Sequence, residues 1–177
     1  MATGSILLPI GAAVMPDGSA SNAAPAMQRV QSSASSPKIH FLQLAFDATT
    51  DEMCYWSFRM PADYLSTPVL KVQYKMASAT SNTVVIEGRV AAVTDGDSTD
   101  VDAKALGTTN ASSATTVPGT AGYIDEISLA LTNNDSVAAG DWVTVSLRRD
   151  ADSTNATDNA TGDMEVIGVA ITYTSTV

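Results

Sequence analysis

The chain has 177 residues, of which 19 are acidic and nine basic, so its formal net charge is −10. Binding to nucleic-acid phosphates requires clustered Lys and Arg, and the only adjacent basic pair is Arg148–Arg149, which excludes a nucleic-acid partner. The length is that of one domain, or of one domain with an appendage. Thr, Val, Ile, Tyr and Trp recur in short runs without a helical period, which predicts an all-β fold.

The N-terminal residues and the single cysteine indicate where the protein assembles. Residues 1–16 contain no Lys or Arg, so they lack the basic region of a signal peptide. The apolar run Ile6–Ile10 is far too short to cross a bilayer. Cys54 is the only cysteine, so no disulfide forms within the chain. We expect assembly in a reducing cytoplasm and no membrane partner.

Residues 1–37 differ in composition from the rest of the chain. They are rich in Ala, Ser, Gly and Pro, and this composition buries too little apolar surface to fold alone. Prolines are spaced along the segment so that they prevent a continuous helix and favour extended chain. These prolines are Pro9, Pro16, Pro25 and Pro37. We predict an extended N-terminal arm over 1–37, with Ile6–Ile10 as its apolar anchor or as a strand added to a neighbouring subunit. The alternative is a flexible tail.

Residues 38–177 show short apolar or alternating runs separated by turn residues, as in a β-sandwich. Strands are predicted over 38–46, 53–60, 69–77, 83–93, 123–131, 142–149 and 164–174, and one or two further short strands within 106–122. The clearest alternation places Leu70, Val72, Tyr74 and Met76 inward. Gly88, in the middle of its strand, predicts a bulge or a close backbone contact. We predict a single β-sandwich, with a jelly roll preferred over a seven-stranded immunoglobulin-like sandwich.

Nucleophilic catalysis would depend on the single histidine or the single cysteine of the chain. His40 is the only histidine, so a Ser-His-Asp or Cys-His arrangement would have to use it. It precedes Leu42 and Leu44 in a predicted strand, which favours a hydrogen-bonded structural histidine. Cys54 shares a predicted inward face with Trp56, so we expect it to act as a small buried hydrophobe. We therefore predict no catalytic residue and no enzyme activity.

Two acidic stretches are candidates for a bound cation, although we predict no metal or cofactor site. Asp95, Asp97, Asp100 and Asp102 lie within eight residues, and hard cations take several carboxylate oxygens from flexible loops. The EF-hand spacing is absent, and Asp-Gly and Asp-Ser are ordinary turn formers. The second acidic stretch has the same two interpretations. It contains Asp150, Asp152, Asp158 and Asp163.

Carbohydrate chemistry would require other side chains. A glycosidase uses two carboxylates about 5 to 10 Å apart, and Glu87 and Glu165 both lie in the middle of predicted strands. Nothing in the sequence pairs them, and outward strand positions commonly carry charge. A sugar-binding face needs exposed aromatic side chains, for which Tyr55, Tyr123 and Trp142 are the candidates. Tyrosine and tryptophan are both more often found in cores or interfaces.

Four segments resemble a β-sandwich family found among tailed-bacteriophage virion proteins. They are residues 58–64 (FRMPADY), 70–75 (LKVQYK), 139–151 (AGDWVTVSLRRDA) and 162–173 (GDMEVIGVAITY). The likeness extends from Lys38 to Tyr173 as a pattern of strands and turns. Members of this family serve as capsid decoration (cement) proteins, head fibres or tail-fibre modules, often as trimers. The resemblance supplies no catalytic residues.

The resemblance and the predicted arm together lead to our first functional prediction. We expect a virion protein that decorates and stabilises a capsid as a homotrimer, with its arm bound to the major capsid protein or to other virion subunits. The alternative is a fibre or receptor-binding module that recognises a host surface polysaccharide. Another virion component, such as a tail or shell protein, and a polysaccharide depolymerase are weaker alternatives.

Overall fold

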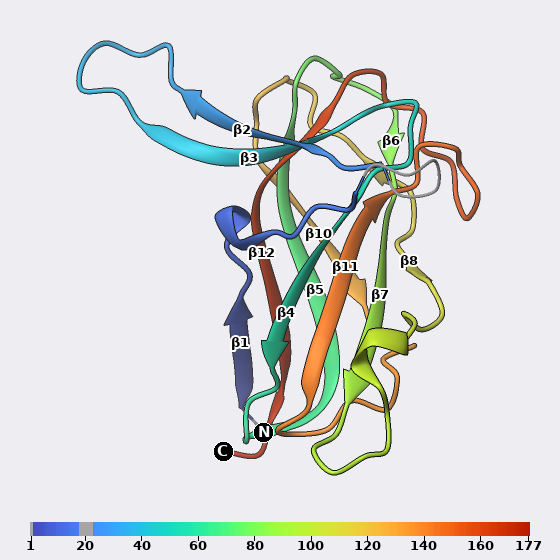
Figure 1. Ribbon diagram of the computed structural model, residues 1–177. Helices are drawn as coiled ribbons and strands as arrows, with labels where there is room; N and C mark the ends of the chain where they lie inside the picture. The colour runs from blue at the N-terminus through green and yellow to red at the C-terminus, as the bar shows by residue number, and fades with distance from the viewer. Residues whose placement is uncertain (1, 18–22) are drawn as a thin grey trace.

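Two antiparallel sheets pack face to face in the computed structural model, which describes residues 2–17 and 23–177 (Figure 1). The larger sheet has six strands in the order β10-β5-β12-β3-β2, and β1 also pairs with β12. The smaller sheet has four strands in the order β4-β11-β7-β8. The fold is therefore all-β, a single sandwich of the jelly-roll type, as the sequence predicted; its strands outnumber those of the seven-stranded immunoglobulin-like alternative.

The two sheets draw their strands from along the whole chain. The larger sheet is built from β1 (Thr3–Leu7), β2 (Ala26–Gln31), β3 (His40–Phe46), β5 (Tyr64–Met76), β10 (Asp125–Ala130) and β12 (Met164–Ser175). The smaller sheet is built from β4 (Met53–Arg59), β7 (Ile86–Val93), β8 (Asn110–Ala111) and β11 (Trp142–Arg149). The short strands β6 (Thr83–Val84) and β9 (Thr115–Thr116) pair with each other, and η1 (Ile10–Ala12) and η2 (Val101–Ala103) are single 3-10 turns. No helix within the described residues is long and apolar enough to cross a membrane.

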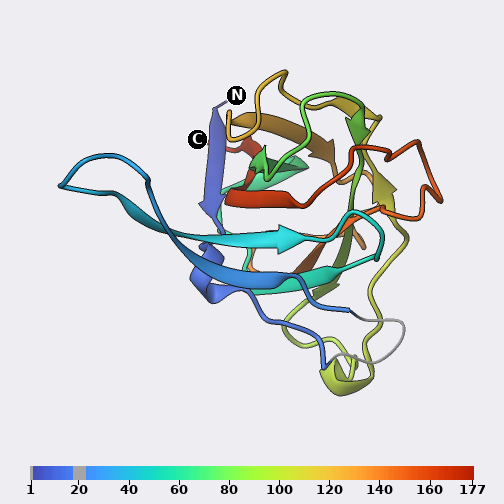
Figure 2. The same cartoon turned by 90° about the horizontal axis from the view of Figure 1, so that it is seen from above.

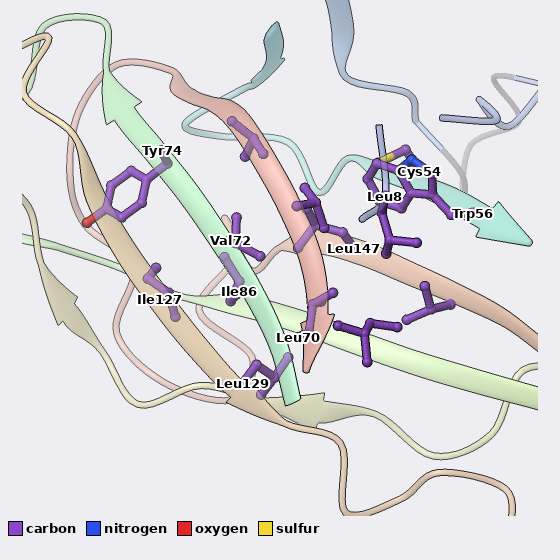
Figure 3. Close-up of a cluster of buried hydrophobic side chains, with 14 of the residues drawn as sticks. Leu8, Cys54, Trp56, Leu70, Val72, Tyr74, Ile86, Ile127, Leu129 and Leu147 are labelled. Carbon is purple, nitrogen blue, oxygen red and sulfur yellow. The ribbon is translucent and has the colours of Figure 1, made fainter. Parts of the chain in front are cut away.

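The core lies between the inner faces of the two sheets (Figure 3). Every second side chain of β5 points inward, so Leu70, Val72 and Tyr74 are fully buried. Trp56 of β4 and Leu147 of β11 meet them from the smaller sheet. This alternation confirms the inward faces that the sequence predicted for β4 and β5.

Two strand glycines, Gly88 and Gly168, have different roles in the sheets. Gly88 was predicted to form a bulge or a close contact, and its pairing with Leu147 is regular, so it does not form a bulge. A Cβ on Gly88 would lie 3.2 Å from methyl groups of Leu129 and Leu131, so the glycine allows a close approach of the opposite sheet. The register instead shifts at Gly168 in β12, where it pairs with β5.

The predicted N-terminal arm is part of the sandwich, which corrects the boundary at residue 37. Strand β1 pairs with β12 from Thr3↔Thr174 to Leu7↔Ala170, and β2 pairs with β3. Leu8 and Ile10 belong to the core, with 3% and 7% of their surface exposed. Residues 1 and 18–22 of the predicted arm lie outside the described residues. Local composition did not reveal these strands because β1 obtains its hydrogen bonds from the opposite end of the chain.

Gly4 provides a test of how closely β1 packs. A Cβ at this position would lie 2.2 Å from ring carbon Cζ of Tyr173. An aromatic ring is rigid, so it cannot move aside as the end of a flexible side chain could. We expect Gly4→Ala to lower the free energy of unfolding by about 1–3 kcal/mol through overpacking. Chemical denaturation checks this value. Gly119→Ala is the control, because nothing lies within 4 Å of its added Cβ; equal stability of the two variants would contradict the packing of β1.

Candidate functional site

The two residues considered for nucleophilic catalysis lie apart and in unsuitable places. Cys54 is fully buried, as predicted, and burial raises the pKa of its thiol, which disfavours the thiolate. His40 was predicted to be a structural histidine, but its side chain is exposed at the start of β3. It is exposed because this end of β3 leaves the body of the sandwich. The structure therefore does not bring these two residues together.

The acidic stretch from Asp95 to Asp102 forms an exposed loop. The Asp100 carboxylate accepts the backbone N–H of Asp102 at 3.0 Å and so caps η2. Within the described residues, the only three metal-binding side chains that approach within 4.8 Å of one another are elsewhere in the chain. The four carboxylates of this loop are therefore spread along it as turn and cap residues.

The three clustered carboxylates belong to Asp51, Asp150 and Asp152. Arg148 already lies among them, because its Nη1 is 2.8 Å from Asp51 Oδ2. Asp150 is fully buried and accepts the backbone N–H of Thr154 at 3.0 Å, which fixes the loop after β11. The arrangement is that of a loop closed around an arginine.

The other two aspartates of the second acidic stretch also have structural partners. Asp158 forms a buried ion pair with Arg149, with Oδ1 2.7 Å from Nη2. Asp163 precedes β12, where its carbonyl accepts the backbone N–H of Ala77 at 3.0 Å. Both contacts attach the 150–163 loop to the sandwich.

The two glutamates considered for a glycosidase lie on opposite sides of the molecule. Glu87 is on the outer side of the smaller sheet, where its Oε2 lies 2.5 Å from Nη2 of Arg148. Burial raises the pKa of Glu87, and Arg148 opposes that rise. Glu165 is on the outer side of the larger sheet and pairs with Lys75. The pair of carboxylates that glycoside hydrolysis needs is therefore not formed by these residues.

The three candidate aromatic residues occupy different places. Tyr123 is 65% exposed in the turn before β10, on the larger sheet. Tyr55 is partly buried in the middle of β4, and its own backbone forms an isolated bridge with Val14. Trp142 is the first residue of β11 and 40% exposed. Only Trp142 lies at a hollow that also contains charged side chains.

This hollow, which we call the Trp142 hollow, has a volume of about 480 Å³. Trp142 pairs with Arg59 of β4 on one side and with Val93 of β7 on the other, so these side chains share the outer face of the smaller sheet. Asp95 and Asp97 extend the wall from the turn that follows β7. The hollow is thus formed where three neighbouring strands of the smaller sheet begin or end.

Two tight turns hold the hollow in place. Gly96 has φ +89°, and Asp97 donates its backbone N–H to the Thr94 carbonyl at 3.1 Å. This hydrogen bond closes the turn that carries the Asp95 and Asp97 carboxylates. Gly140 has φ +88° and donates its backbone N–H to the Met60 carbonyl at 3.0 Å. The Gly140 carbonyl accepts Nε–H of Arg59 at 3.1 Å, so the guanidinium is fixed beside Trp142.

The side chains of the hollow combine three kinds of contact. Trp142 offers a large, rigid apolar surface with a single N–H donor. Arg59 offers only donors, and Asp95 and Asp97 offer only acceptors when ionised. Arg59 takes part in no ion pair within the described residues. The hollow can therefore hold a ligand that has an apolar face surrounded by hydroxyl groups.

Hydroxyl groups continue along the same face beside the hollow. Ser57 of β4 and Thr144 of β11 are paired in the register and their hydroxyls are 2.7 Å apart. Sequence reasoning singled out Trp142 but missed Arg59 and did not link either residue to Asp95 and Asp97. The outward alternation of Arg59 was visible in the sequence, but its neighbours depend on the register between β4, β7 and β11.

No protein-family model matches the sequence, and no curated protein matches it. The solved structures that are similar to this chain include three carbohydrate-binding modules. A family 35 carbohydrate-binding module from Clostridium thermocellum has 8% identity and a TM-score of 0.47, covering 95% of this chain and 97% of the module. CBM27-1 from Caldicellulosiruptor saccharolyticus, solved with mannohexaose, has 8% identity and a TM-score of 0.42, covering 94% and 96%. TmCBM61, solved with β-1,4-galactotriose, has 11% identity and a TM-score of 0.39, covering 97% and 87%. At these identities and TM-scores, the ligands of the three modules are not evidence for the ligand of this chain. Its function is inferred from the Trp142 hollow alone.

Proposed function

We propose that this protein is a carbohydrate-recognising module that binds a saccharide in the Trp142 hollow. The observation that carries the proposal is an exposed tryptophan fixed between a guanidinium and two carboxylates. A pyranose ring places its C–H face on the indole, while Arg59 donates to its hydroxyls and Asp95 or Asp97 accepts from them. Both turns are held by backbone hydrogen bonds, so the site needs little rearrangement to bind.

The same hollow argues for binding without hydrolysis. A glycosidase needs one carboxyl group in apolar surroundings that keep it protonated as the general acid. Asp95 and Asp97 are instead exposed on a turn. The module therefore recognises the sugar and leaves its glycosidic bonds intact.

Replacing Trp142 is the direct test. We expect Trp142→Ala to weaken binding by at least about tenfold, about 1.4 kcal/mol, because it removes the surface on which the ring stacks. An array of immobilised bacterial and plant oligosaccharides identifies a ligand, and isothermal titration then gives Kd for the wild type and the variant. Arg59→Gln should weaken binding through the loss of donors to the hydroxyls.

Tyr123→Ala is the matched control, because Tyr123 is also an exposed aromatic residue but lies on the larger sheet, remote from the hollow. It should bind as the wild type does. Failure of the wild type to bind any saccharide on the array would count against the proposal. So would equal losses of affinity in Trp142→Ala and Tyr123→Ala.

The setting of this module is a proposal from the sequence. The resemblance to phage virion β-sandwiches supports a place on a virion, where binding to a cell-surface polysaccharide would attach the particle to its host. Capsid decoration, our first prediction from the sequence, depended on an arm free to reach neighbouring subunits. Because β1, Leu8 and Ile10 belong to the sandwich, that argument for decoration is lost.

A further inference from the structure

The β2–β3 hairpin, residues 26–46, extends away from the sandwich (Figures 1 and 2). Strand β3 pairs with β12 only from Leu44 to Phe46. Further along β12, from Ala170, its partner is β1, so the first half of β3 has left the sheet. The two strands of the hairpin stay paired from Ala26↔Ala45 to Gln31↔His40. The tip of the hairpin is therefore presented to the surroundings.

The charge of the hairpin is opposite to that of the rest of the chain. Residues 26–46 contain Arg29 and Lys38 and none of the 19 acidic residues. The remainder of the chain carries the other seven basic residues and all the acidic ones, a formal charge of −12. Neither Arg29 nor Lys38 forms an ion pair within the described residues. The hairpin is thus a cationic projection on an acidic protein.

Apolar side chains accompany these cations. Ile39 is 66% exposed, and Met27 and Leu42 are also exposed. A groove of about 610 Å³ lies between the hairpin and the body. Its apolar lining consists of Val30, Ile39 and Phe41 from the hairpin and Ile124 and Ile167 from the body. An apolar groove with cationic neighbours is typical of a protein contact surface.

Strand β2 adds an open edge to this surface. It is the last strand of the larger sheet, and β3 is its only strand partner within the described residues. Its sequence, AMQRVQ, has one charged residue and no proline, so it has little protection against pairing with another chain.

We propose that the hairpin docks on the body of a second copy of this chain. Arg29 and Lys38 would face its acidic surface, and the exposed apolar side chains would lose their contact with water. A contact between two hairpins would place cations against cations, whereas hairpin against body joins opposite charges. Such a head-to-tail contact closes into a ring when its rotation permits.

Charge reversal in the full chain tests the contact. Analytical ultracentrifugation should show that the wild type forms oligomers in a concentration-dependent way. The self-association should weaken as the salt concentration is raised. Arg29→Glu should weaken self-association by at least about tenfold, because a charge near −12 now meets an added negative charge. Ile39→Asp should have a similar effect through the apolar part of the surface.

Arg89→Glu is the matched control, because Arg89 is a partly exposed arginine of β7 with no ion pair within the described residues. It should associate no more weakly than the wild type does, because it leaves the hairpin unchanged and makes the body more acidic, and circular dichroism should confirm that all three variants fold. A wild type that is monomeric at every concentration overturns the proposal, including when its hairpin binds a different acidic protein. Oligomers that Arg29→Glu and Ile39→Asp leave unchanged overturn it too. Saccharide binding is measured separately and does not bear on this result.

Discussion

Arg149→Met is expected to lower the free energy of unfolding by about 3–5 kcal/mol, which is a large fraction of the total stability of a typical domain. Arg149 is fully buried on the inner side of β11 and forms a two-bond contact with Asp158. Its guanidinium also donates to the carbonyls of Ala160, Gly162 and Phe46. All its N–H groups are thus used, and the variant would leave the Asp158 carboxylate buried without its cation.

Urea denaturation followed by tryptophan fluorescence measures this loss. Arg89→Met is the control, because Arg89 lies on the outer face of β7 without an ion pair in the described part of the chain, and it should cost less than about 1 kcal/mol. The double variant Arg149→Met/Asp158→Asn should recover part of the loss, since it removes the buried charge. A loss for Arg149→Met no larger than that of Arg89→Met would contradict the role of the buried pair.

Deleting residues 1–12 is expected to have a comparably large effect. The deletion removes β1, which pairs with β12, and the core side chains of Leu8 and Ile10. It also removes the Pro9 carbonyl, which accepts Nε1–H of Trp56 at 2.9 Å. Loss of a buried Leu or Ile side chain to Ala alone costs about 2–5 kcal/mol, so the truncated chain should not fold stably.

Two measurements distinguish N-terminal residues that are part of the sandwich from an extended arm that the sandwich does not need for folding. Leu8→Ala should lower the midpoint of thermal unfolding, whereas Leu7→Ala, at an exposed neighbouring position, should change it little. The circular dichroism of the truncated chain should show a loss of β structure. A truncated chain that unfolds cooperatively at the wild-type temperature would show that the N-terminal residues are an arm after all.

The parts of the fold that were predictable depend on local patterns. The alternation of Leu70, Val72 and Tyr74 fixed the inner face of β5, because strand side chains alternate whatever their partners. The pairing of β1 with β12 was missed because it joins the two ends of the chain. A short strand in an Ala- and Ser-rich segment has no pattern of its own that distinguishes it from an extended arm.

The candidate site was predictable only in part, for a related reason. Trp142 could be named as a possible sugar platform from residue type alone. Its neighbours Arg59 and Asp95 are far from it in sequence and meet it because β4 and β7 both flank β11. Residue types considered one at a time do not show that these side chains lie together, so the acidic stretch from Asp95 to Asp102 was considered only as a set of turn residues or a possible cation loop.

Chemical-shift mapping tests the central claim most directly. The isotope-labelled protein is titrated with the oligosaccharide that binds best on the array, and the backbone and indole N–H signals are followed. The account predicts that the largest shifts fall on the Trp142 indole, Arg59 and the turn at Asp95 and Asp97, around the hollow that these residues line. Shifts centred on the larger sheet, or on none of these residues, would contradict it.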